Sequence, residues 1–531
     1  MTNQPGFRLG IAPDAPADRT ALIDCRTGER IGYGELTAAV RHVAATLLHR
    51  GLSPGEVVAL VLGNGVPFAV AYHGVLLAGG TVQPLDPLAP ASEWERAVSV
   101  SEATWLVTDR DHWRQLAGLS GARTVRHTVL VDDPGSATLS RTADEDGSAG
   151  EGTDSTGRTW ITWEHVLGEA PAPGRTPFPE ATPAATAVLA SSSGTQGQPR
   201  HVVLTHHNLA RNLDQIHARH QLTGNDVVMT VTPWRHIYGM QMALNHTLLA
   251  GGTLIATASP FDFTAFLRTA QEHRVTVVYL VPDIIARLVR EPAVEEYDLS
   301  ALRVIFSGGA PLPPATAAAC GLRLGAPVLQ GFGMTEAGCT HLVPDGATAP
   351  DGSVGLPLPG TEVRVVDPDT GAILPPGGEG ELWVRGPQIS PGQLVRGHTT
   401  APHTAADGWL RTGDLARVDG DGYCSITGRL KELIKYKGHQ VAPAELEAIL
   451  LAHPAVADAA VVGVPDPTCG ELPKAFVVLA ERIALGELMD HVAEHVPPQR
   501  RIRLIEAVAS LPRNASGKLL RHALVSGSTR P

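Results

Sequence analysis

Short runs of valine, isoleucine and leucine recur along this 531-residue chain, each followed by a turn and then a helical pattern. The clearest are VVALVLGNG (57–65), ATWLVTD (103–109), VTVVYLVPD (275–283) and LRVIFSGGAPL (302–312). Apolar strands that alternate with helices predict βαβ units, whose parallel strands are buried on both faces. The repeat therefore predicts an α/β fold, and the loops after its strands are where such folds bind ligands.

The composition is that of a folded chain without a dominant positive charge. Apolar residues make up 43% of the chain and charged residues 18%, and the formal net charge is −12. This balance argues against nucleic acid as a partner, because binding a phosphate backbone requires clustered lysine and arginine. The 5 cysteines lie far apart without paired spacing, which predicts a reducing, cytoplasmic setting and no disulfide framework or zinc site.

The longest uncharged stretch runs from Val57 to Leu85 and is interrupted by glycines and a proline. This pattern predicts a buried strand and helix instead of a membrane-spanning segment. The N-terminal residues also lack the basic-then-apolar order of a signal peptide. We therefore expect a soluble protein with no membrane partner.

Changes in amino-acid composition and pattern along the chain indicate separate structural units. Residues 132–160 are rich in Gly, Ser, Thr and acidic residues, which predicts a disordered surface insertion. Short strands with Gly/Asp turns begin near residue 361 and predict a β-rich subdomain. A compact α+β segment of about a hundred residues follows Lys431, within the size range of a small domain. The cation-rich junction 428–438 lies between these units and suits a hinge.

The stretch TAVLASSSGTQGQPR (186–200) places small and hydroxyl residues and a cation directly after an apolar strand. Glycines allow close approach to an anion, hydroxyls donate to phosphoryl oxygens, and Arg200 adds positive charge. The spacing is not that of a Walker loop. Taken alone, such a loop is more typical of an exposed turn.

Two further turns follow predicted strands. In QGFGMTEAG (330–338), Thr335 stands beside Glu336, a pair that alone is typical of a helix start with Thr335 as cap. On a nucleotide-facing loop the same hydroxyl and carboxylate would suit phosphate and magnesium. In SGGAPLP (307–313), two glycines would let a flat ring pack on the backbone.

The remaining polar segments lie near the C-terminus. Asp414 in WLRTGD is a candidate acceptor for the two hydroxyls of a ribose. Lys518 in ASGK follows a flexible Ser-Gly, and an isolated lysine there is by itself typical of a solvated tail.

The order of these segments resembles that of the adenylate-forming superfamily of acyl-CoA synthetases, nonribosomal-peptide adenylation domains and luciferases. The similarity covers nearly the whole chain apart from 132–160, and it is nearest to the 4-coumarate–CoA ligase branch. The segments that carry it are PWRHIYGM (233–240), QGFGMTE (330–336), GELWVRGPQI (380–389) and RLKELIKYKGHQVAPAELE (429–447).

The resemblance implies a large N-terminal domain of stacked α/β subdomains plus a β-rich subdomain, joined to a small mobile α+β C-terminal domain. In this chain the large domain would span 1–428, the hinge 429–431 and the small domain 432–531. Lys431 matches the hinge position, about which the small domain would rotate between two half-reactions.

The resemblance also implies ATP-dependent activation of a carboxylic acid as acyl-AMP with release of pyrophosphate. Mg²⁺ would assist, and a thiol, most often that of CoA, would then take the acyl group. Three alternatives stay open: a carrier-protein thiol as acceptor, ATP-dependent diazotisation of an aryl amine with nitrite, and a nucleotide-binding protein without catalysis.

Site residues follow from the motif positions. Those implied to bind ATP or AMP are Ser192, Ser193, Gly194, Thr195, Gln196, Gly197, Arg200, Gly309, Ala310, Pro311, Gln330, Gly331, Phe332, Gly333, Met334, Asp414, Arg429 and Lys431. Those implied to act in catalysis are Lys518, Thr335, Glu336, His236 and Lys435, with Glu336 also the magnesium ligand. Tyr238, Met242, Gly308 and Cys339 would line the acid pocket, and Lys437 and Gly438 would face the acceptor.

Particular roles come with these positions. Lys518 would bridge the substrate carboxylate and the α-phosphate, and domain rotation would then replace it with Lys435. Asp414 and Arg429 would bind the ribose hydroxyls, and His236 would act as a gate near the carboxylate. No pocket position is cationic, which favours an uncharged acyl body: aromatic, arylacrylic or medium-chain.

The chain departs from the family at several points. The phosphate loop usually reads TSGTTG-x-PKG, whereas Gln196, Arg200 and His201 stand here for threonine, lysine and glycine. GHQ (438–440) replaces a more common GFQ, and SPGQLVRGHTT (390–400) replaces a Gly-Tyr and a Pro-Glu-Ala-Thr segment. These changes bear on the acid and the acceptor more than on the nucleotide chemistry.

Overall fold

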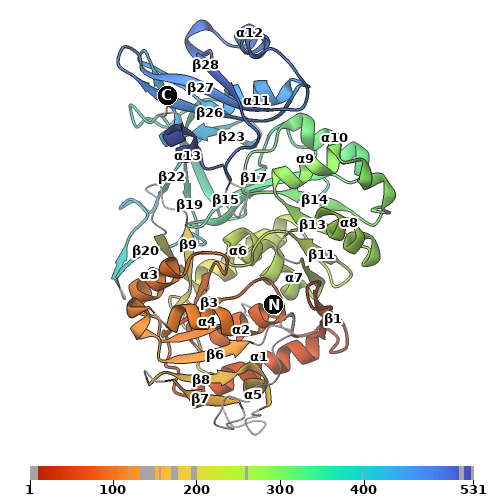
Figure 1. Ribbon diagram of the computed structural model, residues 1–531, viewed down its shortest axis with the longest axis vertical. Helices are drawn as coiled ribbons and strands as arrows, with labels where there is room; N and C mark the ends of the chain where they lie inside the picture. The colour runs from red at the N-terminus through yellow and green to blue at the C-terminus, as the bar shows by residue number, and fades with distance from the viewer. Residues whose placement is uncertain are drawn as a thin grey trace.

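The chain folds into a large unit with a smaller one stacked on one end (Figure 1). The computed structural model describes residues 10–117, 119–131, 150–154, 157–168, 178–192, 200–257, 261–396, 399–513 and 519–527. Within these residues the large unit contains two extended, mostly parallel sheets, so the predicted α/β class is confirmed.

The first sheet contains the apolar runs predicted at 57–65 and 103–109 as neighbouring parallel strands. Its described strands, in spatial order, are β21 Thr399–Ala401, β20 Gly392–Arg396, β10 Arg200–Thr205, β9 Thr186–Ser192, β4 Thr81–Leu85, β3 Val57–Val61, β5 Trp105–Asp109, β6 His127–Val131, β8 Thr159–Thr162 and β7 Glu151–Thr153.

The second sheet contains the runs predicted at 275–283 and 302–312, again as parallel neighbours. Its described strands, in spatial order, are β17 Leu356–Pro357, β16 Gly338–Leu342, β15 Val328–Met334, β14 Val304–Ser307, β13 Val277–Leu280, β11 Val227–Thr230, β12 Thr253–Ala256, β1 Thr20–Asp24 and β2 Arg30–Gly32.

Helices separate and cover these sheets, because each parallel strand presents apolar side chains on both faces. Those described in the large unit are α1 Tyr33–His49, α2 Val66–Leu77, α3 Ala91–Ser101, α4 Arg110–Ala117, α5 Trp163–Gly168, α6 His206–Arg219, α7 His246–Ala250, α8 Phe263–Glu272, α9 Pro282–Arg290 and α10 Pro314–Leu324. A π-helical segment, η2, spans Gly239–Asn245.

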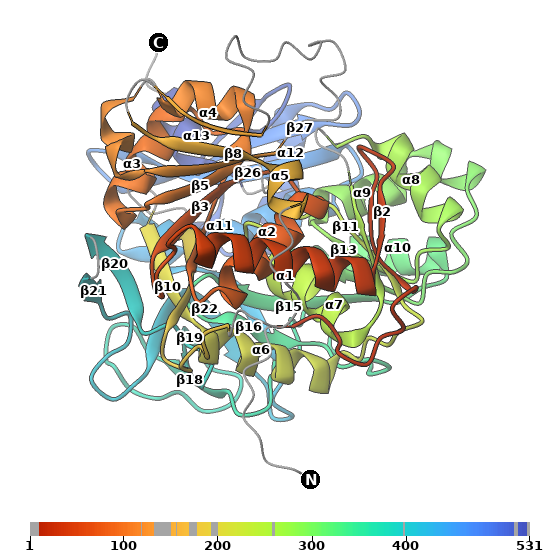
Figure 2. The same ribbon diagram turned by 90° about the horizontal axis from the view of Figure 1, so that it is seen from below.

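Successive residues of one strand enter different cores. In β3, Val58 and Leu60 join the inner core formed with α1 and α2, whereas Val57 and Ala59 join an outer core with α3. In the second sheet, α8, α9 and α10 cover the opposite outer face. Figure 2 shows α1 and α2 between the two sheets.

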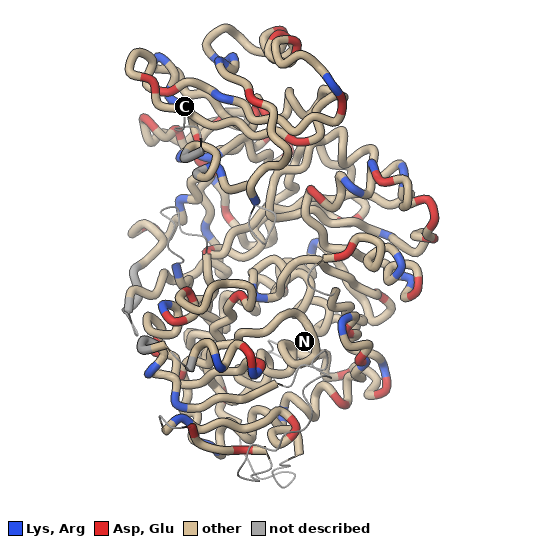
Figure 3. Tube along the Cα trace, viewed as in Figure 1, with Lys and Arg blue, Asp and Glu red and all other residues tan. Residues whose placement is uncertain are grey.

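Helix α2 is apolar on all sides and buried between the sheets, which explains the uncharged stretch from Val57 to Leu85. No helix in the described part of the chain combines the length and apolar character needed to cross a membrane. Lysine and arginine are interspersed with aspartate and glutamate along the described trace, without a purely basic face in this view (Figure 3).

The prediction that residues 132–160 form a disordered surface insertion is wrong for the last part of this range. Glu151–Thr153 forms β7, which pairs antiparallel with β8 and extends the first sheet at its edge. Glycine- and threonine-rich residues join this sheet because pairing uses backbone groups that every residue but proline supplies. Residues 132–149 lie outside the described part of the chain.

The β-rich subdomain predicted near residue 361 is an antiparallel sheet of β18 Glu362–Val366, β19 Glu379–Arg385, β22 Leu410–Val418 and β23 Cys424–Arg429. A single short turn, Leu430–Glu432, connects it to the small unit. The described elements of the small unit are β24 Ile434–Tyr436, β25 His439–Val441, α11 Pro443–Ala452, β26 Val456–Asp466, β27 Gly470–Leu479, α12 Leu485–His495, β28 Leu504–Ala507 and α13 Arg521–Gly527. They enclose a core of their own, and a hinge at 429–431 stays a prediction.

Several histidines are buried in the large unit and held neutral by their surroundings. Burial lowers the pKa of His73, His201 and His206 to about 4, and that of His341 to about 3. The unfolded chain, in contrast, takes up protons on histidine near pH ~6.5. The folded state is therefore destabilised as the pH falls from about 6.5 toward 4, because only the unfolded state gains protons there.

Replacing His73 with leucine should reduce this pH dependence. Between pH 6.5 and 4 each such histidine costs roughly 1.4 kcal/mol of unfolding free energy per pH unit. Urea unfolding at pH 7 and pH 5 should therefore show a smaller loss for His73→Leu than for wild type. His49→Leu, on the exposed surface of α1, is the control and should match wild type. Equal losses for His73→Leu and wild type would contradict this account.

Candidate active site

The carboxyl ends of β11, β13, β14 and β15 converge on one cavity of about 510 Å³. Its walls include Thr232 after β11, Val281 after β13 and Gly308 after β14. Parallel pairing brings these ends to one edge of the sheet, where α/β folds bind ligands. The cavity size is within the usual range for small-molecule sites, about 300–1,000 Å³.

Many residues singled out from the sequence meet in this cavity. Those that line it are Ser192, His236, Tyr238, Met242, Gly308, Gly309, Gly331, Phe332, Gly333, Met334, Thr335 and Cys339. They come from both large sheets and from η2, so the packing of the layers brings them together.

Tyr238 forms part of the cavity wall. Its hydroxyl donates to the backbone oxygens of Leu280 and Phe306, each at 3.3 Å. A Cβ on Gly308 would lie 2.9 Å from Cζ of Tyr238, so glycine is needed for the ring to pack on this backbone. The chain enters η2 after Tyr238, and π-helical segments are frequent at functional sites.

His236 also lines the cavity and is partly buried. Burial, with a smaller contribution from the adjacent Arg235, lowers the pKa of His236 to about 4. The ring is therefore neutral at pH 7. Arg235 donates to Asp86 at 2.7 Å, so its charge is neutralised just outside the cavity. A neutral His236 offers the cavity a hydrogen-bonding edge without adding a charge.

Thr335 and Glu336 lie in the turn of a hairpin between β15 and β16. The alternative interpretation of this pair as a helix start is wrong, because Met334 pairs with Gly338 across the turn. The amide of Ser390 donates to the Glu336 backbone oxygen at 2.8 Å and fixes the turn.

His403 is a neighbour of Glu336 that the motifs did not identify. Burial lowers its pKa, while the charges of Glu336 and Arg200 act on it in opposite directions. The three side chains therefore share one electrostatic environment, on the side of the cavity where the phosphate loop begins.

Asp414 and Arg429 are direct cross-strand partners on β22 and β23. Arg429 Nε donates to Asp414 Oδ1 at 2.7 Å, and the Asp414 side chain is only 3% exposed. The pair expected to bind ribose is thus assembled by strand register, because facing residues of an antiparallel pair have adjacent side chains.

Other sequence-predicted residues lie elsewhere. Those described but outside the cavity lining are Arg200, Ala310, Pro311, Gln330, Glu336, Asp414, Arg429, Lys431, Lys435, Lys437 and Gly438. Lys437 and Gly438, with φ of 49° and 79°, form the turn of the β24–β25 hairpin in the small unit. Ser193, Gly194, Thr195, Gln196, Gly197 and Lys518 lie outside the described residues.

Part of the cavity lining was not predicted from the sequence. Phe261, Asp283, Ile284, Phe306, Leu342 and Arg513 all contribute to the cavity. Asp283 and Ile284 follow the VVYL strand, so the rule that ligands bind after parallel strands would have indicated them. Arg513 comes from the small unit, and no local pattern indicates that it lies here.

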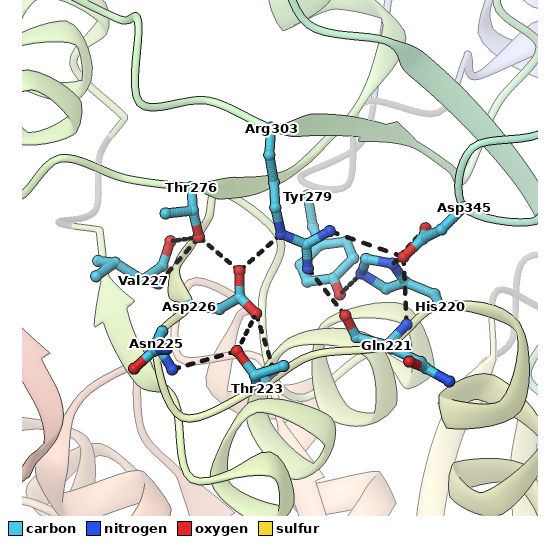
Figure 4. A network of polar contacts seen from close by, with 10 residues as sticks. All are labelled: His220, Gln221, Thr223, Asn225, Asp226, Val227, Thr276, Tyr279, Arg303 and Asp345. Atoms are coloured by element: carbon cyan, nitrogen blue, oxygen red, sulfur yellow. Dashed lines mark hydrogen bonds and ion pairs between the residues drawn. The ribbon is translucent and has the colours of Figure 1, made fainter.

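A polar network backs the wall behind Tyr238 (Figure 4). His220 is hydrogen-bonded to the Tyr279 hydroxyl at 3.0 Å and to Asp345 at 2.8 Å, and the Tyr279 ring packs edge-on against Tyr238. Arg303 donates to Asp226 at 2.7 Å. Burial opposes ionisation of Asp226, but Arg303 and the other hydrogen-bond donors outweigh it, so the pKa of Asp226 is lowered.

Comparison with known proteins places this geometry in a family. A family model for AMP-binding enzymes matches residues 11–394, and a model for the C-terminal domain of AMP-binding enzymes matches residues 445–518. The chain belongs to the AMP-binding enzyme family, whose members form acyl adenylates.

Within that family the curated relatives are CoA ligases. The chain is 36% identical over 525 residues to 4-coumarate–CoA ligase 5 of Oryza sativa subsp. japonica, covering 96% of this chain and 91% of that protein. The ATP-bound structure of MatB from Rhodopseudomonas palustris is similar at a TM-score of 0.84 with 28% identity, covering 97% and 96% of the two chains. The o-succinylbenzoate CoA synthetase MenE of Bacillus subtilis, in complex with its acyl-adenylate intermediate, is similar at a TM-score of 0.79 with 27% identity, covering 99% and 98%.

Asp226→Asn should destabilise the protein by about 1–3 kcal/mol, because it removes the charge that pairs with Arg303 inside the network. The Asp226 side chain is 7% exposed and that of Arg303 is 36% exposed, which places the effect below that of a fully buried pair. Urea unfolding at pH 7 measures it. Glu362→Gln is the control, since its pair with Arg385 lies at the surface and should be worth little. Equal unfolding midpoints for the two variants would contradict a structural role for the network.

Proposed function

We propose that this protein activates a carboxylic acid with an apolar body, aromatic, arylacrylic or medium-chain, as acyl-AMP and then transfers the acyl group to the thiol of CoA. The observation that carries the proposal is the cavity itself. Tyr238 and Met242 line the same cavity as Ser192, Gly309 and Thr335, which belong to the nucleotide motifs.

The apolar part of the lining supports the proposed class of acid. Phe306 and Leu342 line the cavity together with Tyr238 and Met242, and the four pack in the same core. Among the described residues that line the cavity, the lysine or arginine present is Arg513, and it is paired with the carboxylates of Asp283 and Asp458. An uncharged aromatic or aliphatic body would thus be enclosed, as apolar pockets with few polar groups bind such ligands. The name of the rice relative supports an arylacrylic acid.

The polar end supports nucleotide binding. The phosphate loop begins at Ser192 and rejoins the described chain at Arg200, its cross-strand partner. The Asp414–Arg429 pair offers a carboxylate and a guanidinium to ribose hydroxyls. Gly309, with φ of 86° and nothing within 4 Å of an added Cβ, leaves open backbone against which a flat base would pack.

The proposed reaction requires these groups to bring two anions together, the carboxylate and ATP. A carboxylate oxygen would attack the α-phosphorus of ATP, and the bond to pyrophosphate would break. The CoA thiolate would next attack the acyl carbon, and AMP would leave. Lys518, Arg200 and the Thr335 hydroxyl would offset the negative charge, which is how enzymes accelerate such transfers.

The described residues fit magnesium as a partner of the nucleotide. Within the described part of the chain no group of three or more His, Cys, Asp or Glu side chains forms a metal cluster. Mg²⁺ in phosphate-transfer sites commonly binds one or two carboxylates together with substrate phosphates. Glu336, in its fixed turn, would supply that carboxylate, and the ion would neutralise the phosphate oxygens.

Exchange of labelled pyrophosphate into ATP tests the proposal directly. Wild type should catalyse exchange only when a suitable acid is present, across a panel of benzoic, arylacrylic and medium-chain acids. Lys518→Ala should lose at least about a hundredfold of that rate, the usual cost of removing a group that stabilises transition-state charge.

Adding acceptors separates the alternatives. CoA should yield acyl-CoA and AMP, whereas AMP formation only with a carrier protein, or with an aryl amine and nitrite, would assign a different acceptor. A folded wild type that binds ATP without exchange on any acid would overturn the proposal in favour of a nucleotide-binding protein.

Gly308→Ala should narrow the acid pocket. The added methyl would lie 2.9 Å from Tyr238 Cζ, so the ring must shift toward the cavity. We expect kcat/KM for an arylacrylic acid to fall by about tenfold or more, the equivalent of about 1–2 kcal/mol of overpacking, and that for a short aliphatic acid to fall less. Gly486→Ala on α12, with nothing within 4 Å of its Cβ, is the control and should behave like wild type. An equal fall for both acids would show that Gly308 does not shape the pocket.

A further inference from the structure

Helix α9 is where the small unit meets the substrate cavity. At its first turn, Asp283 Oδ2 lies 3.3 Å from Arg513 Nε of the small unit. At its last residue, Arg290 Nη1 donates to the backbone oxygen of Ala457 at 3.2 Å. Figure 1 shows the small unit lying against the end of the large unit that carries α9 and α10.

Arg513 bridges the two units. Besides Asp283 of the large unit, it donates through Nη2 to both carboxylate oxygens of Asp458, at 3.0 and 2.9 Å. A planar guanidinium binds two carboxylates in separate directions, which a lysine ammonium does less well. The side chains of Asp283, Arg513 and Asp458 are 45%, 25% and 31% exposed, so solvent screens the contact only in part.

The contact is also part of the substrate site, since Asp283 and Arg513 both line the cavity. Burial raises the pKa of Asp283 and the nearby Asp458 raises it further, whereas Arg513 acts in the opposite direction. Without Arg513, two carboxylates would face each other across the boundary between the units. The ion pair therefore favours the arrangement in which the small unit closes one end of the cavity.

Arg513 is tied to the segment that leads to Lys518. Its backbone forms an antiparallel bridge with Leu519, and the Leu520 amide donates to the Pro512 oxygen at 2.8 Å. Lys518 directly precedes Leu519 in the sequence. The ion pair on Arg513 is thus linked through backbone contacts to Leu519, the covalent neighbour of Lys518.

A second arginine holds the other side of this segment but does not cross between the units. Arg521 donates to Glu432 at 2.9 Å and to Glu447 at 3.0 Å, and both carboxylates lie in the small unit. These contacts would move with the small unit. Of these two arginines, Arg513 alone reaches the large unit, so its contact with Asp283 would be made in one position of the small unit and lost in another.

We propose that Arg513 is a positioning residue for acyl-AMP formation: its ion pair with Asp283 holds the small unit over the acid cavity in the first half-reaction and is released before the second. This role rests on the proposed function. It predicts that the two half-reactions respond differently to loss of the pair.

The first test separates the half-reactions. Pyrophosphate exchange, with the acid that wild type uses best, measures adenylate formation, and the synthetic adenylate of that acid plus CoA measures thioester formation. Asp283→Asn and Arg513→Gln should each lower exchange by about three- to fivefold, the upper range for a partly exposed ion pair, and leave thioester formation within about twofold. The double variant should resemble the single ones, because the two residues act through one contact.

Glu291→Gln is the matched control. Glu291 directly follows α9, is 45% exposed like Asp283, and pairs with Arg287 of the same helix. It should behave like wild type in both half-reactions. Equal loss in both half-reactions for Asp283→Asn, no loss at all, or multiplied losses in the double variant would overturn the proposal.

A second test does not depend on catalysis. The R290C/A457C pair places two cysteines at the other contact between α9 and the small unit, where a bis-maleimide can span the length of the arginine side chain that is removed. Cross-linking of this pair, followed on denaturing gels, should be about three- to fivefold slower when Asp283→Asn is added. An unchanged cross-linking rate would refute the ion pair as a contact that holds the small unit, whereas a cysteine pair that responds to Asp283→Asn in a protein without exchange activity would refute only the proposed function.

Discussion

Parallel hydrogen bonding between β11, β13, β14 and β15 is the constraint on which the site depends. It brings the residues that follow each strand to one edge, so that Thr232, Val281 and Gly308 face a common cavity. The strands are held in this order by apolar side chains on both faces, which enter an inner core and an outer core. The site therefore depends on the same burial that stabilises the fold.

The cavity combines an apolar wall from the large unit with a boundary from the small unit. Tyr238 is fixed by two backbone acceptors and by packing on Gly308, and the His220–Tyr279–Asp345 contacts support it from behind. Another part of the lining is polar and comes from the small unit through Arg513. In the proposed two-step reaction the acid would stay in one place while the groups that act on it are exchanged.

Features that depend on residues close together in the sequence could be predicted, whereas features that depend on distant residues could not. The strands β3, β5, β13 and β14 were recognised from short apolar runs, because burial on both faces leaves a local composition signal. The strand β7 was missed, since its Glu-Gly-Thr residues lack the apolar composition of a strand and join the sheet by backbone pairing. Thr335 and Glu336 carried two interpretations, and only the pairing of Met334 with Gly338 decided that they form a hairpin turn.

The sequence by itself determined the α/β class, the small apolar and hydroxyl residues at the ends of strands, and, through its motifs, the family. These properties depend on residues that are near one another along the chain. Only the tertiary structure decided which of those residues meet: Tyr238 with Gly308, Asp414 with Arg429, and Asp283 with Arg513. The physical reason is that a contact such as Asp283–Arg513 depends on how separate layers and units of the fold pack together. The residues near either partner in the sequence do not indicate that the two side chains will meet.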